Sequence, residues 1–132
     1  MTYPLDTNIC IAYLGGKSPA VRARLQALSP QSLAVCAVVK AELLFGAIKS
    51  QRSEENLSRV QRFLDPLESF PFDDEAAVVY ASIRHDLERS GTPIGPNDLI
   101  IAAIALSRGC TLVSANTREF GRVPDLMLEN WL

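Results

Sequence analysis

The sequence has few of the residue types on which disulfide scaffolds and zinc sites depend. It contains three cysteines, Cys10, Cys36 and Cys110, and one histidine, His85, among 132 residues. No two cysteines have Cys-x-x-Cys spacing and each lies among apolar neighbours, so we expect buried, reduced thiols and neither disulfides nor a zinc site. A Ser-His-Asp triad built on His85 has no supporting motif in the sequence.

Long hydrophobic runs are also missing. The longest apolar run, Leu99 to Leu106, is too short to span a bilayer and indicates a buried helix. No basic region precedes an apolar stretch with a small-residue cleavage site at the amino terminus, so a secretory signal is not expected. The chain is 48% apolar and 21% charged, which is an ordinary globular balance. We therefore expect a cytoplasmic protein with one domain, residues 1–132, and no membrane association.

A strong excess of one charge is absent over the whole chain, which has a net charge of −2 at pH 7. The charges are nevertheless unevenly distributed. Residues 17–62 contain eight basic and three acidic side chains, whereas residues 63–88 contain one basic and seven acidic ones. Such a separation can give an acidic protein a basic face. The alternative is that both groups are simply solvated helix surfaces.

Short apolar segments alternate with segments of helical periodicity. We expect strands at residues 3–5, 32–36, 69–72 and 111–113, and a last one after Pro124. We expect helices at residues 6–15, 18–29, 38–50, 54–63, 73–90 and 99–107, and a polar turn at 114–118. Most strands are apolar without alternation, which is typical of a parallel sheet buried on both faces. The sequence therefore predicts an α/β fold, a three-layer α/β/α sandwich with a short, mostly parallel central sheet.

Several polar side chains lie next to the ends of predicted strands. Asp6 follows the first strand, Glu42 lies in the helix after the second, and Asp98 lies in the first turn of the most apolar helix. Asn116 and Glu119 follow the next-to-last strand. Because the carboxyl ends of parallel strands border one crevice, we expect these side chains to meet. A carboxylate beside a core must be neutralised, hydrogen-bonded or metal-bound.

Carboxylates that converge without lysine or histidine favour a hard cation. Mg²⁺ or Mn²⁺ takes oxygen ligands and keeps waters, and it can activate a water and stabilise charge on a phosphoryl group. Each acid also has an ordinary interpretation. Asp6 and Asp98 could be helix caps only, and Glu42 could be a surface residue of an amphipathic helix. The spacing alone leaves both interpretations open.

Four segments resemble the PIN-domain ribonucleases, especially the VapC toxins of bacterial VapBC toxin–antitoxin pairs. They occur in the family's order and cover essentially the whole chain: LDTNI, KAELLFG, GPNDLIIAAIA and LVSANTREFGRVPDL. In that family the acids of these motifs form a Mg²⁺ site. The resemblance therefore implies that Mg²⁺, or Mn²⁺ in its place, is bound by Asp6 of LDTN, Glu42 of KAELLFG and Asp98 of PNDLIIA.

The fourth motif departs from the family pattern. VapC-like sequences often read TNNTREF where this chain has SANTREF, so Ser114 and Ala115 differ. Asn116 supplies no charge but can orient a water or a phosphate, and Glu119 is the acid that can complete the set. The resemblance therefore adds Asn116 and Glu119 to the three acids as candidate catalytic residues.

The resemblance implies hydrolysis of phosphodiester bonds in structured RNA, such as tRNA or ribosomal RNA, and inhibition of translation. Asp6 and Asp98 would be the primary metal ligands. Glu42 would bind the metal directly or through water, or help to deprotonate the attacking water. The residues expected to contact the substrate are Thr7, Asn8 and Arg118.

The resemblance also implies protein partners. These are a VapB-type antitoxin that blocks the site, a second copy in a homodimer, and a toxin–antitoxin hetero-oligomer. Apolar side chains of the helical hairpin at residues 38–64 could form the antitoxin groove or could pack the monomer core. They are Leu44, Phe45, Leu57 and Phe63.

Two other functions stay open. The first is a phosphoacceptor or phosphatase domain that is phosphorylated on Asp6, although such sites usually need a lysine near the phosphate, and no lysine follows a late strand. The second is a catalytically inactive interaction module, against which the retained Asp6, Glu42 and Asp98 argue.

Overall fold

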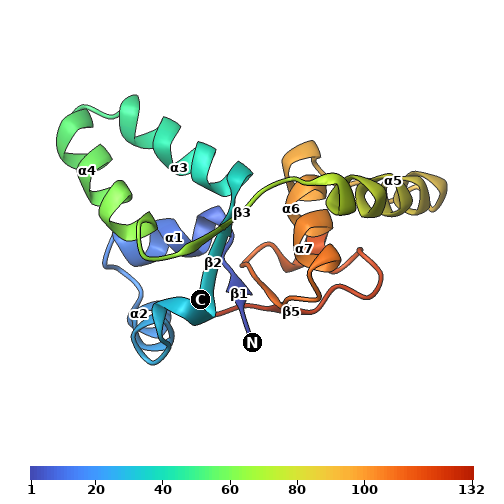
Figure 1. Cartoon of the computed structure of the whole chain (residues 1–132), viewed down its shortest axis with the longest axis horizontal. Helices are drawn as coiled ribbons and strands as arrows, with labels where there is room; N and C mark the ends of the chain where they lie inside the picture. Colours follow the sequence, from blue (N-terminus) through green and yellow to red (C-terminus); the bar gives the residue numbers. More distant parts are fainter.

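The computed structural model describes residues 1–132, and helices alternate with short strands along the chain (Figure 1). The strands are β1 (Tyr3–Pro4), β2 (Leu33–Cys36), β3 (Glu68–Phe70), β4 (Leu112–Val113) and β5 (Leu128–Glu129). The helices are α1 (Thr7–Leu14), α2 (Pro19–Gln26), α3 (Ala37–Ile48), α4 (Ser53–Leu64), α5 (Asp74–Arg89), α6 (Pro96–Ser107) and α7 (Thr117–Phe120), with a 3₁₀ turn η1 (Pro30–Ser32) before β2. The predicted alternation is therefore confirmed.

All strand pairs are parallel, so the carboxyl ends of the strands lie at one edge of the sheet. β1 pairs with β2 and β2 with β3, whereas β4 pairs with β5. A bridge between Leu5 and Val113 joins the two groups, and the Asp6 amide donates a 2.8 Å hydrogen bond to the Val113 carbonyl there. The resulting order is β3-β2-β1-β4-β5, which brings the ends of β1 and β4 side by side.

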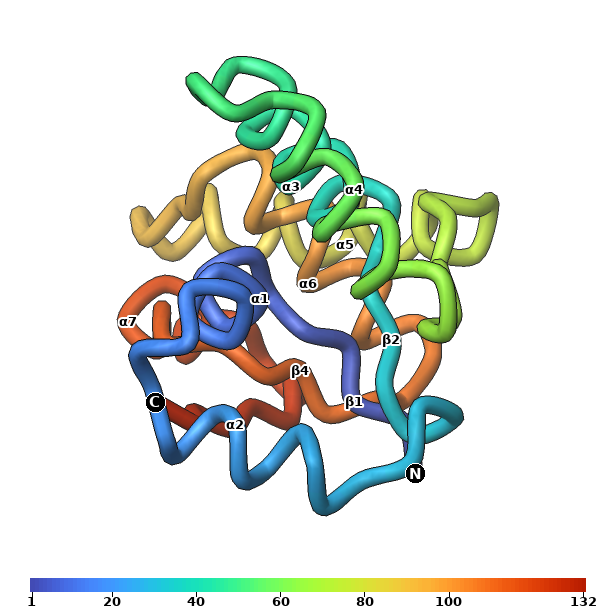
Figure 2. The backbone as a smooth tube through the Cα atoms, turned by 90° about the vertical axis from the view of Figure 1, so that its left-hand side faces the viewer, coloured from blue at the N-terminus to red at the C-terminus, as the bar shows by residue number.

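Helices cover both sides of the sheet. In Figure 1, α1 to α4 lie on one side of the first three strands, and α5 to α7 lie on the other. In Figure 2, turned by 90°, α1 lies in front of the strands, and α3 and α4 pack on each other as the predicted helical hairpin. The three-layer α/β/α prediction is confirmed, and the sheet is parallel throughout.

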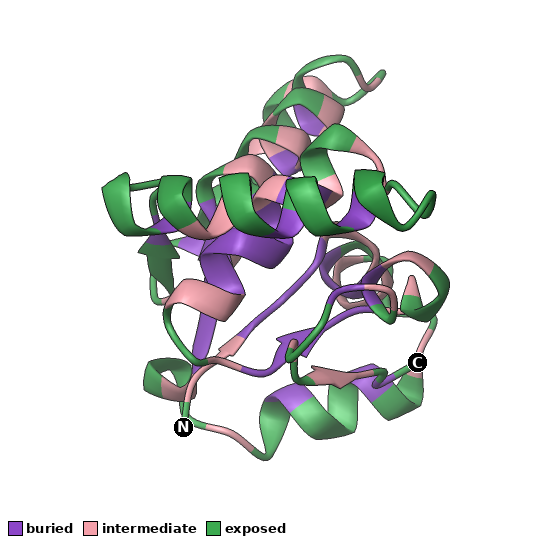
Figure 3. Ribbon diagram, turned by 90° about the vertical axis from the view of Figure 1, so that its right-hand side faces the viewer, coloured by how far each residue is buried: buried purple, intermediate pink, exposed green.

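The most apolar segments lie between the layers (Figure 3). All four residues of β2 are buried, as are six of the twelve residues of α6. A strand covered on both faces needs no alternation of polar residues, and α6 is apolar nearly all round because α3 and α5 both pack on it. No helix is both long enough and apolar enough to cross a bilayer.

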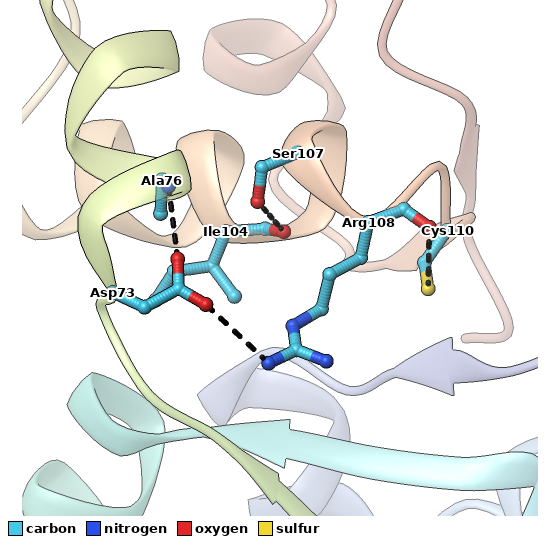
Figure 4. Close-up of polar contacts among 6 residues, drawn as sticks. All are labelled: Asp73, Ala76, Ile104, Ser107, Arg108 and Cys110. Atoms are coloured by element: carbon cyan, nitrogen blue, oxygen red, sulfur yellow. Dashed lines mark hydrogen bonds and ion pairs between the residues drawn. The ribbon is translucent and has the colours of Figure 1, made fainter.

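One contact fixes the start of α5 to the end of α6 (Figure 4). Asp73 caps α5 by accepting a 2.9 Å hydrogen bond from the Ala76 amide. Its other carboxylate oxygen lies 3.8 Å from Nη2 of Arg108, whose guanidinium lies 4.1 Å from the centre of the Phe70 ring. The β3–α5 junction is thereby tied to the residue that follows α6.

Two local predictions were wrong in part. The polar turn expected at residues 114–118 covers residues 114–116 only, and residues 117–120 form a helical turn, α7, whose Phe120 is fully buried. The residues before Phe120 are mostly polar, so the helical turn has no local periodicity to detect. Cys10 and Cys36 are buried thiols as expected, but Cys110 is partly exposed.

Candidate active site

Asp6 lies where β1 ends and α1 begins, at the junction of β1 with β4. Its side chain is 5% exposed. Oδ1 accepts a 2.9 Å hydrogen bond from the Thr7 amide, and Oδ2 accepts one of 2.7 Å from the Ser114 hydroxyl and one of 3.3 Å from the Asn8 amide group. The carboxylate is thus held in one orientation at the amino terminus of α1, where the helix dipole favours a negative charge.

The surroundings of Asp6 shift its pKa in opposite directions. Burial raises the pKa of this carboxyl, hydrogen bonds from Ser114 and Thr7 lower it, and the nearby charge of Glu42 raises it. Burial dominates, so the pKa of Asp6 is above its usual value. A buried carboxylate with a raised pKa is stabilised in its ionised form by a nearby positive charge.

Glu42 lies on the face of α3 that meets α1 and α6. Its Oε2 accepts a 3.0 Å hydrogen bond from the Thr7 hydroxyl, and its Oε1 accepts a 3.3 Å hydrogen bond from the Asn97 amide. The side chain is half-buried. Because residues of two other helices hold it, Glu42 is not a free surface residue of an amphipathic helix.

Asn116 connects Asp98, in the first turn of α6, to Glu119 in α7. The side-chain amide of Asn116 donates to Oδ2 of Asp98 at 2.9 Å and to Oε2 of Glu119 at 3.2 Å. Asn116 is itself positioned by its backbone amide, which donates to the Ser114 hydroxyl at 2.9 Å. Ser114 therefore links Asp6 to the part of the site that contains Asp98 and Glu119.

Negative charge accumulates around Asp98. Partial burial, a hydrogen bond with Glu119 and the charges of Asp6, Glu119 and Glu42 raise the pKa of Asp98 to about 7. Hydrogen bonds with Asp98 and Asn116 lower the pKa of Glu119. Asp98 is the more buried of the pair, so its pKa is raised while that of Glu119 is lowered. Four carboxylates from separate parts of the sequence thus act on one another, and we name them the four-acid cluster: Asp6, Glu42, Asp98 and Glu119.

No side chain of the four-acid cluster forms an ion pair, and the charge of Arg122 acts on Glu119 only by helping to lower its pKa. The four ion pairs of the structure lie elsewhere, and no lysine takes part in any of them. No three His, Cys, Asp or Glu side chains converge tightly enough to enclose a metal ion. Mg²⁺ keeps several waters and uses only one or two carboxylates. A hard cation held by these oxygen ligands would therefore keep most of its waters.

Thr7, Asn8 and Arg118 differ in their surroundings. Thr7 holds Glu42, and Asn8 donates to Asp6 while its Oδ1 accepts a 3.2 Å hydrogen bond from the Ala115 amide. Both side chains therefore brace the site. Arg118 is exposed on α7 next to Glu119 and forms no ion pair. Only Arg118 of the three has its side chain free to reach a ligand.

Sequence reasoning missed two residues of the site, Ser114 and Asn97. Ser114 is fully buried, and a hydroxyl directly after an apolar strand requires a hydrogen-bond partner, which is a usable signal. The sequence does not indicate that this partner is Asp6, 108 residues away. Asn97 gives no such signal, since it stands in an exposed first turn where asparagine is common.

Comparison with known proteins gives a family match and similar structures. Residues 3–126 match the model of the PIN domain family. The chain is 39% identical to ribonuclease VapC2 of Rickettsia felis over 99% of this chain and 98% of that protein. It is also 39% identical to the tRNA(fMet)-specific endonuclease VapC of Salmonella typhimurium, with the same coverage.

Solved structures agree with this match. The structure superposes on the crystal structure of VapBC2 from Rickettsia felis bound to a DNA fragment from their promoter with a TM-score of 0.93, at 38% identity and with both chains fully covered. The TM-score is 0.94 for DNA-bound VapBC from Salmonella typhimurium, at 38% identity, with 100% of this chain and 99% of that one covered.

Proposed function

Because the chain belongs to the PIN-domain family, we propose that it is the toxin of a type II toxin–antitoxin pair. It is an endoribonuclease of the VapC type that hydrolyses phosphodiester bonds in structured RNA and thereby inhibits translation. PIN-domain ribonucleases are metal-dependent, and Mg²⁺ is the metal proposed here, with Mn²⁺ as a substitute. Residues 1–132 form a single PIN domain that works in the cytoplasm, where its RNA substrates are.

One observation carries this proposal: no side chain of the four-acid cluster forms an ion pair. Burial and the neighbouring carboxylates raise the pKa of Asp98 to about 7, and carboxyl groups perturbed in this way cluster at functional sites. Asp6 and Asp98 would be the primary ligands of Mg²⁺, with Glu42 bound directly or through water. When bound, the metal polarises the phosphate and lowers the pKa of its bound water.

The other residues of the site position these groups. Ser114 holds Asp6, and Thr7 and Asn97 hold Glu42. In the proposal Glu42 helps to take the proton of the attacking water. Asn116 orients Asp98 and Glu119 by donating to both, and Arg118 binds a phosphate of the substrate. The roles of Asn116 and Arg118 are positional and electrostatic.

The antitoxin is proposed to occupy a groove between α1, α3 and α4. This α1–α3–α4 groove has a volume of about 340 Å³, and its lining includes Ile11, Leu43, Val60 and Glu42. Ile11 in the groove is 58% exposed, and Phe45 of α3 is 62% exposed, so both present apolar surface that a partner can cover. A VapB-type antitoxin that lies here covers apolar surface and reaches the four-acid cluster at Glu42.

None of the four side chains expected to form an antitoxin groove, Leu44, Phe45, Leu57 and Phe63, lines the α1–α3–α4 groove. Leu44, Leu57 and Phe63 are half-buried and pack against the core. Phe45 is exposed next to the groove residue Gly46 in the chain, so we propose that it contacts the antitoxin beside the groove. VapBC complexes among the similar structures support a toxin–antitoxin hetero-oligomer, in which we propose that the toxin is a homodimer.

RNA cleavage tests the proposal. The purified chain is incubated with unfractionated tRNA in Mg²⁺, in Mn²⁺ and in a chelator, because one relative is named a tRNA(fMet)-specific endonuclease. Cleavage is expected with either metal and not with the chelator. Asp6→Asn and Asp98→Asn should abolish it, whereas Asp74→Asn, at an exposed position in the first turn of α5, should not. Metal-dependent cleavage that survives both cluster substitutions contradicts the proposal.

A further inference from the structure

Arginines without acidic partners gather where α1 ends. Arg59 of α4 donates to the carbonyl of Leu14, the last residue of α1. Arg22 of α2 lies close to Gly16, in the turn that follows α1. A Cβ added to Gly16 would lie 3.2 Å from Nη2 of Arg22. Arg62 lies one turn after Arg59 on α4. None of the three arginines forms an ion pair, because the four pairs of the structure use Arg24, Arg52, Arg84 and Arg108.

A second groove follows from the first at this point. The Arg59–Arg62 groove has a volume of about 500 Å³ and is lined by both arginines, by Tyr13 and Phe63, and by parts of α2, η1 and the segment before β3. Leu14 and Arg59 line both this groove and the α1–α3–α4 groove. The two grooves therefore meet at Leu14 and Arg59, with Glu42 in the lining of the first and Arg62 in the lining of the second.

The length of this path suits a few nucleotides. The eight residues of α1 span about 12 Å at ~1.5 Å per residue. That distance corresponds to about three to four nucleotides of stacked strand at ~3.4 Å each. The rings of Tyr13 and Phe63 lie 5.5 Å apart between their centres and are both partly exposed, so they offer an aromatic floor to a base or sugar.

The charges along the path favour a polyanion. Glu42 is the only acid that lines either groove, and the guanidinium fork matches two phosphate oxygens at once. The four-acid cluster itself repels RNA, so binding energy must come from groups outside it. We propose that the RNA strand leaving the active site runs along α1 to α4, where Arg59 and Arg62 bind successive phosphates beyond the cleaved bond.

This inference rests on the proposed function and names the surface that holds its substrate. An antitoxin in the α1–α3–α4 groove lies across the same path and therefore competes with RNA. The experiment measures RNA binding by fluorescence anisotropy, with labelled unfractionated tRNA as the probe, in a salt series. All proteins carry Asp98→Asn so that the probe stays intact. The variants are Arg59→Gln, Arg62→Gln and the double substitution, with Arg89→Gln on α5 as control.

The double variant is expected to bind the labelled tRNA at least tenfold more weakly than the Asp98→Asn protein at physiological salt. The slope of log affinity against log salt should fall by about 1.4, at ~0.7 for each lost contact to a single strand. Each single variant should lose about half of that slope. Arg89→Gln should change neither value, since Arg89 is exposed at the far end of α5 on the other side of the sheet (Figure 1). Equal thermal unfolding of all variants excludes a folding defect as the cause.

The outcomes separate this inference from the proposed function. If the wild-type chain cleaves tRNA while the double variant keeps its affinity and salt slope, the RNA path is wrong and the ribonuclease assignment stands. If the double variant loses antitoxin in co-purification but binds RNA normally, the groove serves a protein and the inference is overturned. If the wild-type chain binds tRNA through these arginines but never cleaves it, the proposed function fails and the binding surface stands.

Discussion

The substitution Ser114→Ala tests how the site is held together. Ser114 is fully buried. Its hydroxyl donates a 2.7 Å hydrogen bond to Asp6 and accepts one of 2.9 Å from the backbone amide of Asn116. A hydrogen bond to a charged group contributes about 1.5–3 kcal/mol, and a buried amide left without a partner adds to the loss. We expect the free energy of unfolding to fall by about 2 kcal/mol, or about 6–10 °C in melting temperature.

The same substitution should weaken metal binding. Without the Ser114 hydroxyl, the pKa of Asp6 rises further and Asn116 is no longer fixed, so fewer molecules present an ionised, oriented carboxylate. Hydrogen bonds that orient a metal ligand typically contribute about 10–100-fold in metal affinity. Isothermal titration with Mg²⁺ and thermal unfolding in a chelator measure the two effects separately.

Ser107→Ala is the matched control. The Ser107 hydroxyl donates only to the Ile104 carbonyl of its own helix (Figure 4). Ser107 is the last residue of α6, whereas Asp98 lies in the first turn of that helix. We expect a change below about 0.5 kcal/mol and unchanged Mg²⁺ affinity. If Ser114→Ala behaves like Ser107→Ala in both measurements, the reasoning that Ser114 joins the two halves of the site is refuted.

Two further predictions follow from charge and exposure. In a chelator, stability should fall as the pH rises from about 4 to about 7, because Asp98, with a pKa raised from 3.8 to about 7, keeps a proton in the folded state that the unfolded chain releases. Urea unfolding at several pH values should show this loss to be smaller in Asp98→Asn, and an equal loss in both proteins would contradict it. Phe45→Ser should leave stability within about 0.5 kcal/mol, because Phe45 is 62% exposed, yet it should release the antitoxin in co-purification. Retained antitoxin would place the groove elsewhere.

Much of the fold could be predicted because its signals are local. Short apolar segments without alternation mark the buried parallel strands, and β2 is the clearest case, with all four residues buried. The resemblance to the PIN-domain family is confirmed by the family match and the similar structures. The expectation that Asp98 and Glu119 lie close together follows from the rule that parallel strands end at one edge, and Asn116 bridges them.

The remaining features depend on contacts between distant residues. Ser114 reaches Asp6 because the β1–β4 bridge brings the two strand ends together. The sequence of neither strand indicates that the two pair. Helix α7 forms because Phe120 is buried. The charge excess of residues 17–62 is compatible with both a basic face and solvated helices. Arg22 and Arg59 of this range approach the end of α1, and this contact between separate helices cannot be read from the charge pattern.

A metal soak tests the central claim most directly. Crystals of the chain are soaked in Mn²⁺ and the anomalous difference map is calculated at the four-acid cluster. We expect a single region of anomalous density beside Asp6 and Asp98, and none there in crystals of Asp98→Asn. Strong density elsewhere, or none at the cluster in a protein that still cleaves RNA only with Mn²⁺, would contradict the assignment of these acids as the metal site.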